Sequence, residues 1–211
     1  MATNIATPEN AAATCESVQD IIDIAVTAEA LAVTALGAAL ESAAKGTLKL
    51  NAEHIQAFTA ARAEEQAHYD VLTSAGAKPL TTTFTVPDPK IFTDAATFLP
   101  AVIGLEEAFV AAYLAAAQEF AILGKPELSQ LALAIASVEA EHRVAVRSFA
   151  VEAGMLKGLP NDIAFEQALF ASVGAAADAL KQLGWIGGSG AQITYPGPGK
   201  IDPTGVNQLK P

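Results

Sequence analysis

The chain has 211 residues, 17% of them charged, and a formal charge of −11 at pH 7. This length suits one domain, or one domain with a small appendage, and is sufficient to bury a sizeable core. Alanine occurs 47 times and aromatic residues make up only 6%, a composition that favours close-packed helices over a β-sandwich. With only 12 Lys and Arg, a nucleic-acid-binding function is not expected, and the single Cys15 excludes an internal disulfide framework.

The sequence shows no targeting segment. No Lys or Arg precedes Lys45, so the N-terminus lacks the basic region of an export signal or a transit peptide. Glu29 and the pair Glu106-Glu107 interrupt the most apolar stretches, so no membrane-spanning helix is expected. These features predict a cytoplasmic protein, provided that no export signal has been removed.

Long segments rich in Ala, Leu and Val recur along the chain, and each ends near a glycine, as helices often do. Ser17 and Asn51 are suitable N-terminal caps, and Pro126 suits the first turn of a helix. The pattern predicts five helices, over residues 17–45, 51–75, 97–123, 126–153 and 161–183.

The connections predict the topology. Short turns join the first helix to the second and the third to the fourth, which makes two antiparallel hairpins. The long connection over residues 76–96 contains a β-prone run at 81–86 and allows the second hairpin to start from the opposite end. We therefore expect an all-α four-helix bundle with an added fifth helix over residues 17–184. A flexible segment over 1–16 would precede it, and an irregular Gly/Pro-rich tail over 185–211 would follow.

Two of the three histidines have a glutamate three residues earlier, as Glu65 with His68 and Glu139 with His142. Residues three apart on a helix project from one face, so each pair offers a carboxylate and an imidazole to one point. Each pair also lies 14 and 17 residues after its own turn, counted from Asn51 and from position 125. The two pairs therefore lie at the same height in the bundle.

Each partner helix supplies one more carboxylate at that height. Glu29 lies 17 residues before Gly46, and Glu106 lies 18 before Gly124. At about 1.5 Å per residue, both fall within a turn of the Glu-x-x-His pair on the neighbouring helix. Glu106 is preferred to Glu107 because it shares the bulky apolar face of its helix, and likewise Glu65 is preferred to its neighbour Glu64 because it has the histidine.

Four carboxylates in an apolar core would each carry a desolvation cost of several kcal/mol and would repel one another. Few Lys or Arg accompany them at this level of the first three helices. Two divalent cations would cancel the four charges and take the two histidines as neutral donors. The expected metal ligands are Glu29, Glu65, His68, Glu106, Glu139 and His142.

This order of ligands on four helices resembles the ferritin-like di-iron or di-manganese carboxylate superfamily over about residues 17–153. The segments 27–31 and 105–113 look most like its desiccation-related bacterial and plant branch. The resemblance implies that Glu65 and Glu139 bridge two metal ions, iron most readily or manganese, and that the other four ligands are terminal. It also implies oxidoreductase chemistry on O2, peroxide or Fe(II), of a ferroxidase, peroxidase or catalase type.

Tyr113 follows Glu106 by seven residues, a spacing that is frequent in this family, and is the candidate catalytic side chain beside the ligands. The alternative is a core tyrosine whose hydroxyl has a hydrogen-bond partner. The corresponding position on the first helix is Leu36, where relatives often carry tyrosine, so a symmetric pair of tyrosines is not expected. His54 lies near the start of its helix and is expected to face solvent. The weakly charged helix faces are compatible with a homodimer.

A second hypothesis comes from another class of protein. In it the bundle is a stress-related structural or interaction protein whose metal stabilises the fold without catalysis, or whose site stays empty. Two metal ions per chain would favour the dinuclear hypothesis. Equal oxidation rates in wild type and Glu65→Ala would show that the site does not catalyse the oxidation.

Overall fold

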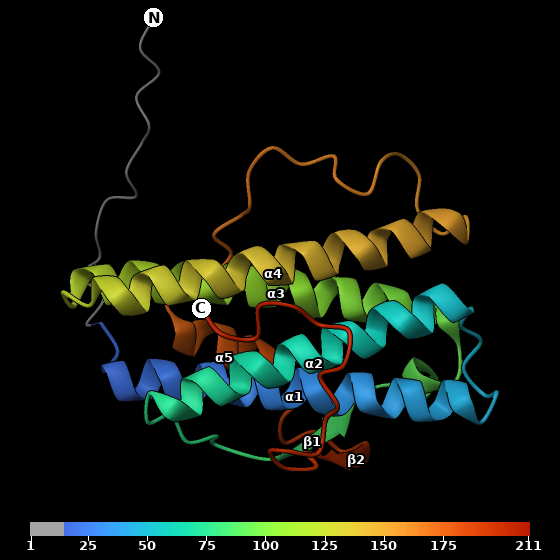
Figure 1. Ribbon diagram of the computed structural model, residues 1–211, viewed down its shortest axis with the longest axis horizontal. Helices are drawn as coiled ribbons and strands as arrows, with labels where there is room; N and C mark the ends of the chain where they lie inside the picture. The colour runs from blue at the N-terminus through green and yellow to red at the C-terminus, as the bar shows by residue number, and fades with distance from the viewer. Residues whose placement is uncertain (1–14) are drawn as a thin grey trace, which may run out of the picture.

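The computed structural model describes residues 15–211 and confirms an all-α bundle. Its four long helices form two hairpins that lie side by side (Figure 1). The helices are α1 (Val18–Ala44), α2 (Ala52–Ser74), α3 (Ala95–Ile122) and α4 (Pro126–Glu152). Each boundary lies within two residues of the predicted one. Helix α1 packs mainly on α2, and α3 mainly on α4.

Local signals explain these boundaries. The Ser17 hydroxyl accepts a hydrogen bond from the Asp20 amide at 3.1 Å, and the Asn51 side chain accepts one from the His54 amide at 2.8 Å. Both bonds satisfy amides that the first turn of a helix leaves unpaired. Gly46 then ends α1 with a φ of +72°, a conformation that is easy only for glycine.

The long connection between the hairpins is ordered and pairs with the tail. It contains strand β1 (Thr83–Val86) and the 3₁₀ helix η1 (Pro89–Phe92), and β1 is antiparallel to β2 (Ala191–Thr194). Thr83 lies opposite Thr194, and Val86 lies opposite Ala191. The prediction of a wholly irregular tail is therefore wrong at β2. This four-residue strand is mostly exposed, and its apolar–polar alternation is too short to stand out from the Gly/Pro-rich sequence on both sides of it.

The fifth helix is shorter than predicted, because α5 covers only Val173–Gln182. The residues before it, 155–172, form no helix in the structure. Two arginines of α4 hold this segment through Arg143–Glu166 contacts of 2.6 Å and an Arg147–Asp162 contact of 2.5 Å. These contacts to α4 replace the helix that the sequence pattern suggested.

Ser172 caps α5, and two carboxylates that are buried or half-buried accept its first free amides. The Val173 amide donates a hydrogen bond to Glu119 Oε2 at 3.0 Å, and the Gly174 amide donates to Glu16 at 2.9 Å. These are the amides that a new helix leaves free. The predicted flexible segment lies outside the described residues up to position 14, whereas Glu16 is held in place by these bonds.

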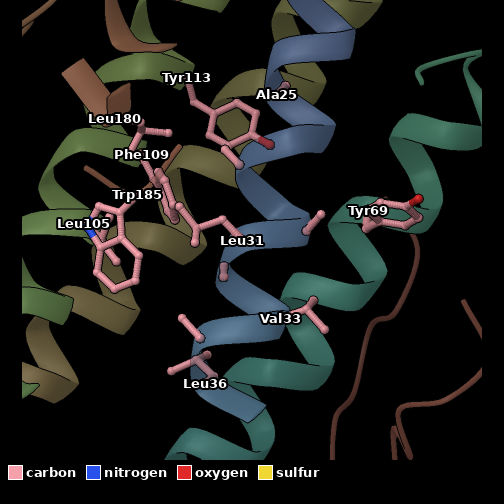
Figure 2. Close-up of a cluster of buried hydrophobic side chains, with 14 of the residues drawn as sticks. Ala25, Leu31, Val33, Leu36, Tyr69, Leu105, Phe109, Tyr113, Leu180 and Trp185 are labelled. Atoms are coloured by element: carbon pink, nitrogen blue, oxygen red, sulfur yellow. The ribbon is translucent and has the colours of Figure 1, made fainter. Parts of the chain in front are cut away.

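Helix α1 is the centre of the molecule, since α2, α3, α5, η1 and β2 all contact it. Figure 2 shows the apolar cluster on one side of it, where Phe109, Leu180 and Trp185 approach Leu31. Alanines along α1 and α3 allow this close approach of the helices. The core therefore surrounds the helix that carries Glu29.

By length and composition alone, α1 and α3 could each cross a membrane. Their most apolar windows have mean hydropathies of 1.8 and 1.6, and 78% and 56% of those residues are buried inside the bundle. A buried core helix has the same composition as a membrane span. Burial within the protein therefore accounts for their apolar character.

Candidate metal centre

The six predicted ligands meet between the four long helices. Glu29 comes from α1 and Glu106 from α3, whereas α2 and α4 each supply a Glu-x-x-His pair. Among the described residues they form two groups whose potential ligand atoms lie within 4.8 Å of one another. All six side chains are buried, and the glutamates are at most 4% exposed.

The first group surrounds His68. Its Nδ1 atom lies 3.4 Å from Glu29 Oε2, 3.5 Å from Glu65 Oε2 and 3.2 Å from Glu139 Oε1. One imidazole nitrogen thus faces three carboxylates that come from three different helices. Nitrogen and oxygen donors of this kind suit iron, manganese and zinc.

The second group surrounds His142. Its Nδ1 atom lies 3.1 Å from Glu65 Oε1 and 3.3 Å from Glu139 Oε2, and Glu106 completes the group. Glu65 and Glu139 therefore belong to both groups. Each of them turns one oxygen toward His68 and the other toward His142, which is the arrangement of a carboxylate that bridges two ions.

The unpaired atoms of the cluster test whether metal ions fit it. Six buried ligand atoms have no hydrogen-bond partner, namely Glu29 Oε2, both oxygens of Glu65, His68 Nδ1, Glu106 Oε2 and Glu139 Oε1. A buried polar atom without a partner is rare and costly. All six belong to the predicted ligands, and the residues present therefore fit two cations.

Protons partly take the place of cations when the cluster is metal-free. Burial raises the pKa of Glu29 to about 8, and it raises the pKa of Glu106 well above its usual range. Burial alone would lower the pKa of His68 and of His142, but the carboxylates around them raise both well above the usual value. Metal binding at this cluster must therefore displace protons.

Two further side chains hold the ligands from outside. The buried Tyr113 hydroxyl donates a hydrogen bond to Glu29 Oε1, so Tyr113 lies beside the ligands, and its catalytic role stays a prediction. Figure 2 shows Tyr113 between α3 and α1. Glu64 Oε2 lies 2.7 Å from His142 Nε2, on the ring edge opposite the cluster. A carboxylate at that nitrogen orients a metal-binding imidazole and strengthens it as a ligand.

Sequence reasoning set Glu64 aside in favour of Glu65, although both are functional candidates. Glu64 has no histidine three residues later, so its contact with His142 depends on how α2 meets α4. His54 is a second difference, because it is only 9% exposed rather than solvent-facing. Its ring packs on Phe149 of α4, with a centroid separation of 4.2 Å, and it has no place in either group.

Fold and site together define a four-helix bundle whose buried carboxylate–histidine cluster can hold metal ions. In the comparison with known families, the model of the ferritin-like domain matches residues 17–152, which is more than half of the chain. The chain therefore belongs to the ferritin-like family. Comparisons with curated proteins and with solved structures give no match.

Proposed function

We propose that the cluster holds two divalent ions, iron or manganese, and that the protein is an oxidoreductase acting on O2, peroxide or Fe(II). The observation that carries this proposal is the sharing of Glu65 and Glu139 by both groups, with their oxygens divided between the two histidines. A pair of redox-active ions supplies electron transfer to or from oxygen species.

The chain's own residues have separate tasks in this proposal. Glu65 and Glu139, which belong to both groups, would bridge the two ions, and Glu29, His68, Glu106 and His142 would be terminal ligands. Tyr113 restrains Glu29 by its hydrogen bond, and Glu64 restrains His142. The apolar walls around Glu29 and Glu106 exclude water, which strengthens the electrostatic interaction between the ligands and the ions.

Metal analysis tests the proposal first. Protein expressed with iron or manganese should contain about two ions per chain, and Glu65→Ala should lose both. Glu53→Ala is a matched control, since Glu53 lies exposed in the first turn of the same helix. Metal-replete protein that carries no ion would contradict the dinuclear site.

Turnover tests the chemistry. Fe(II) oxidation and peroxide consumption should be faster with wild type and Glu53→Ala than with Glu65→Ala. Equal rates for all three proteins, when wild type and Glu53→Ala hold two ions and Glu65→Ala holds none, would instead support a metal that stabilises the bundle without catalysis. That outcome would be consistent with the dinuclear site but would contradict the oxidoreductase function.

A further inference from the structure

A pocket of about 360 Å³ opens beside the metal centre, between α2 and α4. These two helices contact each other far less than the helices within each hairpin do. The C-terminal segment, residues 206–211, lines the side of the pocket opposite the bundle. Figure 1 shows this segment crossing α2 and ending near α4. A volume of this size is at the lower end of the range for small-molecule sites.

The pocket reaches the cluster directly, because His68 lines it. His68 Nδ1 faces the carboxylates of the first group, and the ring also forms part of the pocket wall. Glu64, which contacts His142 of the second group, lines the same pocket. A molecule bound here would therefore touch one ligand of the cluster and the side chain that holds another.

The lining determines which molecules the pocket can take. Aliphatic side chains dominate it, including Val71, Leu131, Ile135, Val138 and Leu209. Glu64 and Glu141 also line it, and their charge disfavours an anion, while the lysine of the described lining, Lys210, belongs to the C-terminal segment. An apolar body without charge gains most from such walls.

The chain is fastened over α2 before it reaches the pocket. The Tyr195 hydroxyl donates a 2.9 Å hydrogen bond to Gln66 of α2, and its ring lies 4.6 Å from that of Tyr69. Residues 206–211 follow and are mostly exposed. The segment thus forms a wall that is held at one end and is only lightly packed at the other.

We propose that this pocket binds an uncharged, largely apolar organic molecule against His68, with residues 206–211 forming its outer wall. The binding itself stands on the pocket, and only its position beside two metal ions rests on the proposed function. The ferritin-like fold then brings an organic ligand, and not only O2, peroxide or Fe(II), next to the cluster.

Fluorescence titration with N-phenyl-1-naphthylamine, an uncharged apolar probe, tests the proposal on metal-free and Zn(II)-loaded full-length protein. Ala134→Trp places a large ring in the pocket wall at an exposed position of α4 and should weaken binding at least about tenfold. Leu133→Trp is the matched control, because Leu133 is 48% exposed and does not line this pocket. It should leave the affinity within about twofold.

A chain that ends at residue 205 tests the outer wall and should also bind the probe more weakly. Circular dichroism and metal content identify any variant that fails to fold. Absence of probe binding to wild type, or equal affinity in wild type and Ala134→Trp, would overturn the proposal. Probe binding without metal uptake would support the proposed pocket and contradict the proposed dinuclear site. The failure of one proposal can therefore be distinguished from the failure of the other.

Discussion

Replacement of a glutamate shared by both groups is the most direct test of the centre. The two oxygens of Glu139 lie 3.2 Å from His68 Nδ1 and 3.3 Å from His142 Nδ1, whereas Glu106 belongs to the second group alone. In the proposed dinuclear site, Glu139→Gln would therefore alter a ligand of both ions, and Glu106→Gln would alter a ligand of one. We expect about two ions in wild type, about one in Glu106→Gln and almost none in Glu139→Gln.

The expected change in Tm follows from the fact that a metal ion which binds only the native state stabilises that state. Loss of a partner outside the ligand shell weakens metal binding by about 10- to 100-fold, so loss of a ligand should weaken it by at least about 100-fold. An ion present at 100 times its dissociation constant stabilises the native state by about 2.7 kcal/mol. For a chain of this length that stabilisation corresponds to a rise in Tm of about 5–11 °C for each ion bound. This rise should vanish in Glu139→Gln.

Metal counting by mass spectrometry after equilibration with Mn(II), together with calorimetry with and without the ion, measures both quantities. Glu107→Gln is the matched control, because Glu107 is the exposed neighbour of Glu106 on α3. It should keep two ions and the full rise in Tm. The bridging geometry is refuted if Glu139→Gln retains both ions with the affinity of wild type.

Three further predictions concern pH, the α4–α5 segment and the sheet. Because the folded metal-free protein keeps a proton on Glu29, with a pKa of about 8 against 4.5, its stability should fall as the pH rises from 4.5 to 8. Glu29→Gln should flatten this slope by up to about 1.4 kcal/mol per pH unit in urea unfolding, and parallel slopes would contradict the shift. Arg143→Ala removes two 2.6 Å bonds to Glu166, so hydrogen exchange between α4 and α5 should accelerate about tenfold or more, and unchanged exchange would count against the tether. Gly190→Ala would place a Cβ in steric clash with the Val86 carbonyl oxygen of β1 and should lower the Tm. Gly104→Ala is the matched control, because its Cβ would meet open space on an exposed helix face, and it should raise stability by about 0.5–1 kcal/mol.

Much of the bundle could be predicted because its signals are local. Ser17 and Asn51 cap helices whatever the rest of the chain does, and glycines such as Gly46 end them. The ligands could also be predicted, since an i, i+3 pair shares a helix face and the helical rise turns residue counts into heights. Glu65 with His68 meets its partners for this reason.

The rest depended on partners distant in the chain. Glu64 reaches His142 across 78 residues, and His54 is buried because Phe149 of α4 covers it. Helix α5 begins where Glu119 and Glu16 accept its first amides, a meeting that no local pattern encodes. These contacts arise only when the hairpins pack.

The amino-acid pattern alone determined the four long helices and the six donor side chains that lie at the same height along them, because helix periodicity is a local property of the backbone. Only the tertiary structure decided that Glu65 and Glu139 divide their oxygens between two histidines, and that the chain's end lines a pocket at His68. Side-chain direction and the path of the tail depend on which helices lie together, and that choice is made by burial of apolar surface over the whole molecule.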